Sequence, residues 1–386
     1  LPPDIFRQVV EAVGDDRLAD VLGRLEVDDI VHLVAELPEE RRAAVVGLLP
    51  EDRRADLRKA ELYPEHSAGR VMTTDFVALD AKMTAQEAID HIRARGSRGE
   101  TDAILYLYVV DDEGLLQGVV PIRRLVTSAP DRPCGELMIR EPVSVRADTD
   151  QEEVARIVAR YNLLAIPVVD AGGRMVGLIT VDDVIDVIQE EATEDIYNLA
   201  GLDEEERVFS PVGLSVRKRL PWMVVNLATA FLAASVVGLF RHTIEQVVTL
   251  AIFMPVVAGM AGNTGVQALT VVARGIALGE TEFSSGLRAV GKQFLVCVAV
   301  GAVTGSLGAL VAYYWGGSPV FGLVVFVAML LSMAVAGLAG AAVPLMLKAL
   351  NQDPALGSGV LVTTFTDAVA FFTFLGIATL FLERLS

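Results

Sequence analysis

A single carboxylate, Asp367, lies well inside a long apolar segment, ten residues from the start and fifteen from the end of the stretch 357–382. A carboxylate at that depth in a membrane costs roughly 2.5–3.5 kcal/mol on insertion scales, so it should face water or a partner. Two interpretations stay open. Either Asp367 is protonated and hydrogen-bonded to neighbouring threonines, or it is a cation site in a pore, where a carboxylate offsets the lost solvation of the ion.

A second polar motif interrupts another apolar segment. Residues 259–265 read Gly-Met-Ala-Gly-Asn-Thr-Gly and follow Pro255. This composition should weaken a helix and turn backbone carbonyls toward water, which a membrane tolerates only where protein or a cavity satisfies them. Glycine-rich stretches also serve close helix packing, so the motif is ambiguous by itself. Combined with a carboxylate at membrane depth, it predicts a pore lining.

A third group is a dense row of acids outside the apolar segments. In residues 181–200 the carboxylates recur at steps of three and four, which places them on one side of a helix, while Val184, Val187, Ile188 and Ile196 make an apolar side. An acidic row is usually only a solvated face. Here like charges at these spacings destabilise an isolated helix, which favours a divalent cation as their partner. The acids are Asp183, Asp186, Glu190, Glu191, Glu194 and Asp195.

These three groups of residues lie in two halves of the chain that differ strongly in net charge. The chain has 386 residues and a net charge of −18, and residues 221–386 contain as many basic as acidic residues, so residues 1–220 carry the whole excess. Such an acidic surface favours cations as partners and argues against nucleic acid. A hydrolytic enzyme is also disfavoured, because the four histidines are scattered and no P-loop or nucleophile elbow is present.

The second half contains five apolar segments of the length that a bilayer requires, about 20 residues each. Seven Lys and Arg residues flank the segment ends on the side of the acidic half and only two flank the other side, so the first half is expected in the cytoplasm and the C-terminus outside. A buried core of a large soluble protein is the alternative, and five apolar runs of this length disfavour it. The segments are 222–240, 247–272, 294–314, 320–347 and 357–382.

The first half contains two kinds of internal repeat. Residues 1–62 repeat with a step of 12, with acids at each expected helix start and proline at Pro38 and Pro50; this predicts a stack of short helices. Residues 70–190 contain a longer duplication, in which Val71-Met72 corresponds to Leu137-Met138. Each copy alternates strand and helix patterns in the order β-α-β-β-α.

This duplication resembles a tandem pair of CBS domains, which usually form one regulatory module. Thr180 and Asp183 fit the Thr-x-x-Asp pattern with which such domains often hold an adenosine ribose. Many tandem pairs bind no nucleotide, so ATP at the CBS domains stays an open alternative.

The whole constellation resembles the MgtE family of magnesium channels. Four local motifs carry the resemblance: residues 63–72 (YPEHSAGRVM), 191–196 (EATEDI), 262–265 (GNTG) and 364–367 (TFTD). It covers nearly all of the chain and implies a multidomain fold. The domains expected are an α-helical repeat domain at 1–66, α+β CBS domains at 67–132 and 133–188, a connecting "plug" helix and linker at 181–216, and an all-α membrane domain of five transmembrane helices at 217–386.

The resemblance implies a Mg²⁺-selective channel that imports magnesium across the plasma membrane and closes when cytosolic Mg²⁺ binds between acids of the CBS domains, the N domain and the plug helix. It also implies a homodimer with the pore on the two-fold axis, to which each protomer contributes Asp367. The pore residues implied are Asp367, Gly259, Gly262, Asn263, Thr270, Thr363 and Thr364. The regulatory Mg²⁺ ligands implied are Asp150, Glu152, Asp183, Asp186, Glu191, Glu194 and Asp195.

Two residues depart from the family pattern. Val266 stands where some relatives have a polar pore residue, and Asn162 stands where some have a regulatory Asp. Finer selectivity and affinity therefore do not follow from the resemblance.

Two other classes of protein remain as alternatives. A proton- or sodium-coupled divalent-cation transporter would also place an Asp in mid-membrane, but it would not conduct when Mg²⁺ is the only ion with a gradient. A membrane-anchored CBS nucleotide sensor would need no carboxylate at that depth.

Overall fold

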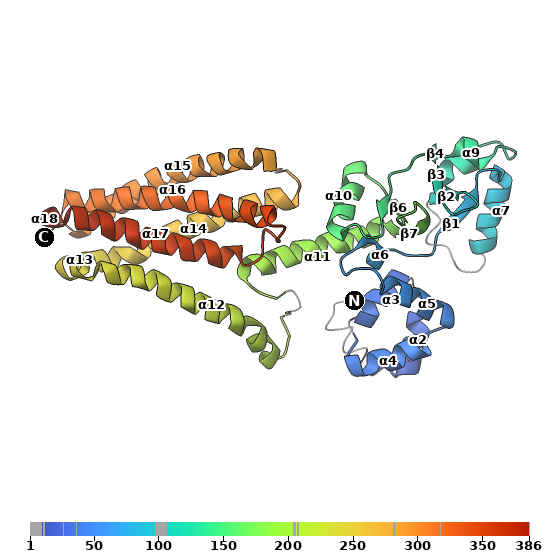
Figure 1. Ribbon diagram of the computed structural model, residues 1–386, viewed down its shortest axis with the longest axis horizontal. Coiled ribbons are helices and arrows are strands. Elements are labelled where there is room, and N and C mark those ends of the chain that lie inside the picture. Colours follow the sequence, from blue (N-terminus) through green and yellow to red (C-terminus); the bar gives the residue numbers. More distant parts are fainter. Residues whose placement is uncertain are drawn as a thin grey trace. The chain divides into compact units, whose positions relative to one another are not determined.

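The structure is a computed structural model (Figure 1) that describes residues 10, 12–25, 27–35, 37–96, 106–203, 206, 208–280, 283–316 and 318–385. The chain divides into two compact units, Leu1–Glu191 and Ala192–Ser386. Each unit contains buried apolar clusters of its own.

The first unit begins with four short helices that confirm the predicted repeat. They are α2 (Asp15–Leu22), α3 (Val27–Ala35), α4 (Glu39–Leu48) and α5 (Glu51–Ala60), and each begins 12 residues after the one before. Pro38 and Pro50 directly precede α4 and α5, where a missing N–H is harmless. Leu22, Ile30 and Leu49 are buried between the helices. Glu26, which belongs to the first predicted repeat unit, lies outside the described residues.

The first CBS copy has the predicted order of strands and helices. Strand β1 pairs parallel with β2, and β2 pairs antiparallel with β3, as a β-α-β-β unit requires. The elements are α6 (Ala68–Val71), β1 (Val77–Asp80), α7 (Ala85–Gly96), β2 (Tyr106–Val110), β3 (Leu116–Pro121) and α8 (Ile122–Val126). The second copy begins with α9 (Cys134–Leu137) and β4 (Ile139–Arg140), and β4 pairs with β3 of the first copy.

The second copy repeats this arrangement with a three-stranded sheet, in which β5 pairs parallel with β6 and β6 pairs antiparallel with β7. Its elements are β5 (Val145–Arg146), α10 (Gln151–Tyr161), β6 (Ala165–Val169) and β7 (Met175–Thr180). Helix α11 (Val181–Ala200) follows and is the predicted connecting helix. On its apolar side Val184 and Val187 are buried, whereas Ile188 and Ile196 remain 47% and 67% exposed.

The second unit contains five helices that are long and apolar enough to cross a membrane, as predicted. They are α12 (Val212–Leu239), α14 (Thr249–Ala277), α15 (Phe283–Gly316), α16 (Pro319–Ala349) and α17 (Ser358–Leu380); the short α13 (Arg241–Gln246) and α18 (Leu382–Leu385) accompany them. Helix α16 packs against α14, α15 and α17, and α12 packs mainly against α17 (Figure 1). The chain is therefore a multi-pass membrane protein.

The expectation that residues 259–265 weaken their helix is wrong, because α14 runs unbroken through them. A Cβ on Gly340 of α16 would collide with the carbonyl oxygen of Gly265, and a Cβ on Gly265 would lie 2.8 Å from Val362 Cγ1 of α17. The absence of these Cβ atoms lets three helices approach closely, and this contact supports the helix that the glycines would weaken in isolation.

Candidate functional site

Asp367 lies on α17 beside α14, where it is half-buried. A Cβ built on Gly262 of α14 would lie 3.9 Å from Asp367 Oδ1 and 3.9 Å from Thr366 Oγ1. This distance is an ordinary van der Waals contact, so the methyl group of an alanine at position 262 would just touch the carboxylate. Glycine at that position leaves the space beside Asp367 open, so the structure brings together two of the predicted pore residues.

Helix α14 carries an exposed polar face next to this carboxylate. Gly259, Asn263, Gln267 and Thr270 are all exposed in the protomer and recur at steps of three and four, which is one side of a helix. Gly262 lies at the edge of the same side, where an added Cβ would come within 3.9 Å of Asp367 Oδ1. We call the four exposed residues the polar face of α14. It lies in a segment whose length and composition place it in the membrane.

The threonines that precede Asp367 use their hydroxyls within their own helix. Thr363 Oγ1 donates to Gly359 O at 2.9 Å, Thr364 Oγ1 donates to Val360 O at 2.7 Å, and Thr366 Oγ1 donates to Thr363 O at 3.0 Å. A threonine that bonds the carbonyl one turn earlier needs no other partner. These three hydroxyls therefore donate to backbone carbonyls and not to Asp367.

Three of the seven predicted regulatory acids, Asp150, Glu152 and Asp183, lie at the starts of two helices in the first unit. Asp150 caps α10, where its Oδ1 accepts from Glu152 N at 2.9 Å. The buried side chain between them, Gln151, donates through Nε2 to Glu191 Oε1 of α11 at 2.7 Å and lies 3.2 Å from His66 Nδ1. Gln151 thus joins the start of α10 to α11 and to the segment that precedes α6.

Asp183 lies in the first turn of α11 and contacts two residues, Thr180 and Asp28. Its carboxylate accepts from Thr180 N at 3.2 Å and from Thr180 Oγ1, which closes a capping box at the start of the helix. Asp28 of α3 also lies within hydrogen-bonding reach, and burial raises the pKa of Asp183 above its usual value. Helix capping is therefore one role of the Thr-x-x-Asp pattern.

The remaining predicted ligands lie further along α11. Asp186 is exposed, and Glu194 and Asp195 are half-buried. In the part of the chain that the structure describes, no group of three or more Asp, Glu, His or Cys side chains is close enough to hold a metal ion.

Three residues at these sites were not predicted from the sequence. Asp28 reaches Asp183, Gln151 reaches Glu191, and Gln267 extends the polar face of α14. Periodicity could have found Gln267, because it lies four residues after Asn263 and three before Thr270. The contacts of the other two have no local signal, because each joins residues far apart in the chain.

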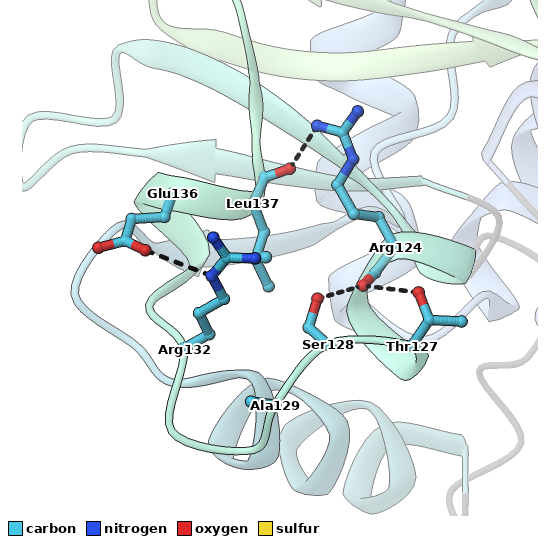
Figure 2. A pocket seen from close by; sticks show the side chains of 7 residues that line it. All are labelled: Arg124, Thr127, Ser128, Ala129, Arg132, Glu136 and Leu137. Atoms are coloured by element: carbon cyan, nitrogen blue, oxygen red, sulfur yellow. Dashed lines mark hydrogen bonds and ion pairs between the residues drawn. The ribbon is translucent and has the colours of Figure 1, made fainter.

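A hollow of about 550 Å³ lies in the first CBS copy (Figure 2). Its lining includes Arg124, whose Nη1 donates to Leu137 O at 2.9 Å, and Arg132, whose Nε lies 3.4 Å from Glu136 Oε2. Ser128 Oγ donates to Arg124 O at 2.5 Å. Two guanidinium groups make this hollow unsuitable for Mg²⁺, and much of its polar lining is already bonded internally.

Comparison with known proteins gives three matches to family models. The divalent cation transporter model MgtE matches residues 254–377, the CBS domain model matches residues 68–131 and 134–190, and the MgtE intracellular N domain model matches residues 1–66. Between them the three models match most of both units.

Similar whole proteins come from bacteria. Magnesium transporter MgtE of Bacillus subtilis is 34% identical over 98% of this chain and 83% of its own length. Magnesium transporter MgtE of Thermus thermophilus is 37% identical over 95% of this chain and 80% of its own length. A solved structure described as the cytosolic domain of the Mg²⁺ channel MgtE in complex with ATP is 36% identical, covers 48% of this chain and 76% of that chain, and has a TM-score of 0.46.

Proposed function

The chain belongs to the MgtE family of magnesium transporters, and from this premise we propose that it is a Mg²⁺-selective channel. It imports Mg²⁺ across the plasma membrane, with the first unit in the cytoplasm and the C-terminus outside, and it closes when Mg²⁺ binds to the acids of its cytosolic part.

The observation that carries the proposal is the polar face of α14 beside Asp367. Amide and hydroxyl groups in a membrane-spanning helix are unfavourable against lipid, as is a half-buried carboxylate. Gly262 leaves open the space that a side chain would fill in front of that carboxylate. A water-filled passage along α14 solvates all of these groups, and a cation in it is attracted by Asp367.

Mg²⁺ passes this site with most of its water shell. The ion releases its inner waters reluctantly and is usually held through one or two carboxylates together with several waters. A ring of Asp367 and the amide and hydroxyl groups of α14 suits such a hydrated ion, because each group can accept a hydrogen bond from its waters.

A homodimer completes the passage. One copy of α14 and α17 supplies only one wall, and a two-fold axis beside the polar face of α14 would place a second Asp367 opposite the first. An apolar groove of about 290 Å³ in the second CBS copy supports the same assembly, because Leu164, Ile185 and Ile188 line it and are 48%, 58% and 47% exposed. A second copy of the chain is the occupant that covers both surfaces.

Cytosolic Mg²⁺ closes the channel by relieving repulsion among acids. Two like charges about 4 Å apart repel by about 1 kcal/mol in water and about 4 kcal/mol at an effective dielectric constant of about 20. Mg²⁺ stabilises the contact between Asp28 and Asp183, which already lie within hydrogen-bonding reach of each other, and it bridges Asp150 and Glu191. The remaining acids, which add to the field that attracts the ion, are Glu152, Asp186, Glu194 and Asp195.

The energy needed for closure is within reach of a few such ions. A swing of the equilibrium from 1:99 to 99:1 needs about 5.5 kcal/mol of differential binding. One ion at about a hundred times its dissociation constant supplies about 2.7 kcal/mol, so two or more sites suffice.

Patch-clamp recording of the purified full chain in liposomes tests the proposal. Mg²⁺ is the only ion with a gradient, and Mg²⁺ on the side of the first unit is titrated. We expect Mg²⁺-selective currents that vanish as this Mg²⁺ rises, and block that is lost when Asp183, Asp186, Glu191, Glu194 and Asp195 are replaced together by Asn or Gln. Absence of current without a proton or sodium gradient would indicate a coupled transporter instead.

A further inference from the structure

Helix α15 packs mainly along one of its sides. Its main neighbour is α16 (Figure 1): a Cβ on Gly286 would lie 3.3 Å from Leu345 Cδ1, and one on Gly301 would lie 3.4 Å from Met333 Cβ. On the opposite side, five exposed residues recur at steps of three and four, which is one face of a helix. We call them the outer ridge of α15: Arg288, Lys292, Leu295, Ala299 and Val303.

The two basic residues of the outer ridge lie just outside the hydrocarbon of the membrane. At the other end of α15, Tyr314 and Trp315 are 75% and 71% exposed, and exposed Tyr and Trp are typical of the boundary between membrane and water. The hydrocarbon core is about 30 Å thick, which about 20 helical residues span. Counted back from Tyr314, the opposite boundary falls near Leu295. Lys292 and Arg288 lie about one and two turns beyond it, where their long side chains reach the lipid headgroups.

The described part of the chain supplies no anion to these two cations. Arg288 and Lys292 are exposed, and neither forms an ion pair or a side-chain hydrogen bond with a described residue. Like charges four residues apart on a helix repel each other. Arg219, near the start of α12, by contrast donates through Nε to Glu206 Oε1 at 2.8 Å. An anion from outside the chain would remove the repulsion between Arg288 and Lys292.

We propose that Arg288 and Lys292 bind the phosphate of an anionic phospholipid, whose acyl chains lie along the rest of the outer ridge. A guanidinium group binds phosphate oxygens in pairs, and an ammonium group binds them as a point charge. Leu295 and Val303, which are 67% and 64% exposed, continue the ridge into the hydrocarbon and suit an acyl chain. The site requires only that the chain spans a membrane, so it does not depend on the proposed channel function.

Basic residues at a membrane boundary also orient transmembrane helices. Orientation alone involves the charge of the segment and no particular lipid molecule. A bound lipid, by contrast, requires both a phosphate with net negative charge and a chain beside the apolar part of the ridge. Selectivity for one lipid headgroup therefore separates the two explanations.

Native mass spectrometry of the purified full chain tests the site. The protein is titrated with dioleoyl phosphatidylglycerol, which is anionic, and with dioleoyl phosphatidylcholine, which has the same acyl chains and no net charge. We expect the wild type to bind the anionic lipid more tightly. Arg288→Gln with Lys292→Gln should weaken that binding by about tenfold or more, because each basic residue near an anionic lipid contributes about a factor of five. Binding of the uncharged lipid should stay the same, which also shows that the variant is folded.

Two further variants control for charge. Arg241→Gln with Arg384→Gln removes the same number of exposed positive charges from α13 and α18, and it should leave binding of the anionic lipid unchanged. Arg288→Lys with Lys292→Arg keeps both charges and should retain most of the binding. An equal loss in the two Gln double variants would show an effect of net charge alone and would overturn the site.

A soluble competitor separates a lipid from a free phosphate. Glycerol phosphate carries the anionic group without acyl chains, so at millimolar concentration it should not displace phosphatidylglycerol from the wild type. Displacement would show that the two cations recognise phosphate alone and would overturn the assignment to a lipid. Equal affinity of the wild type for the anionic and the uncharged lipid would overturn it as well.

Discussion

Among single residues, Asp367 and Gly262 have different roles in the proposed cation site. The carboxylate supplies charge at membrane depth, and glycine supplies the room beside it, since a Cβ there would already lie 3.9 Å from Oδ1. A cation site needs both, because a charge without space for a hydrated ion binds nothing.

Replacing Asp367 by Asn keeps the shape of the side chain and removes its charge. We expect Mg²⁺ current through the open channel to fall by about tenfold or more, the effect of losing roughly 1.4 kcal/mol of attraction, together with a loss of selectivity over monovalent cations. Single-channel recording in liposomes measures both. Glu383→Gln removes an exposed acid beyond the end of α17 and should change neither; normal Mg²⁺-selective currents in Asp367→Asn would refute the assignment.

The raised pKa of Asp183 predicts that Mg²⁺ binding at the proposed regulatory site depends on pH. Because burial raises its pKa, the folded chain without Mg²⁺ binds this proton more tightly than the unfolded chain, so the stability that the group contributes increases as pH falls and is lost as pH rises through the folded pKa. Mg²⁺ requires the deprotonated form. Protons should therefore displace Mg²⁺ from Asp183 at a higher pH than from an exposed Asp.

We accordingly expect the half-blocking Mg²⁺ concentration to rise as the pH on the side of the first unit falls from about 7.5 to about 5.5. The rise should be smaller in Asp183→Asn. It should match the wild type in the control Glu190→Gln, which neutralises an exposed acid of the same helix. Patch-clamp titration at each pH measures it. An equal pH dependence in the wild type and in Asp183→Asn would contradict the role of this carboxyl.

Among the helices of the membrane region, the glycines act mainly through packing. Gly340 and Gly265 bring α16 and α14 into backbone contact, and Gly337 lies against Cys297 of α15. In lipid, where apolar burial does not drive helix association, such close approach supplies much of the attraction.

Gly340→Ala should therefore destabilise the helix bundle by about 1–3 kcal/mol, since its Cβ has no room beside the Gly265 carbonyl. Denaturant unfolding of the purified protein in detergent measures the change. Gly291→Ala on α15 is the control: nothing lies within 4 Å of its Cβ, and alanine favours the helix. Equal stability of the two variants would show that the contact between α14 and α16 tolerates a methyl group.

At the scale of the whole molecule, we propose that two surfaces of the chain contact a second copy. These surfaces are the polar face of α14 and the apolar groove beside α11. Charge in the groove should oppose assembly, because a buried carboxylate without a partner is unfavourable. We expect Ile185→Asp to weaken dimerisation by about tenfold or more. Light scattering in detergent at several protein concentrations measures it; Val126→Asp, at a 64% exposed valine in the first CBS copy, is the control, and a fully dimeric Ile185→Asp would contradict this interface.

Much of the architecture could be predicted because it follows from periodicity. A step of 12 residues indicated the starts of α3, α4 and α5, the alternation of strand and helix patterns indicated both CBS copies, and continuous apolar runs indicated five long helices. The same reasoning failed at residues 259–265, where helix propensity suggested weakness and contacts from α16 and α17 keep α14 continuous. A segment of low helix propensity can therefore remain helical when packing against neighbouring helices supports its backbone.

The order of amino acids is enough to show which residue types occur at membrane depth and along α11: one carboxylate, a glycine-rich motif and a row of acids. Which of them meet became visible only in three dimensions, where Gly262 lies against Asp367, Asp28 near Asp183 and Asn198 on Asp353. The contact between Asn198 and Asp353 joins residues 155 positions apart in the chain. The physical reason is that periodicity records only how a segment divides its side chains between faces, whereas a contact between distant segments depends on how whole helices pack.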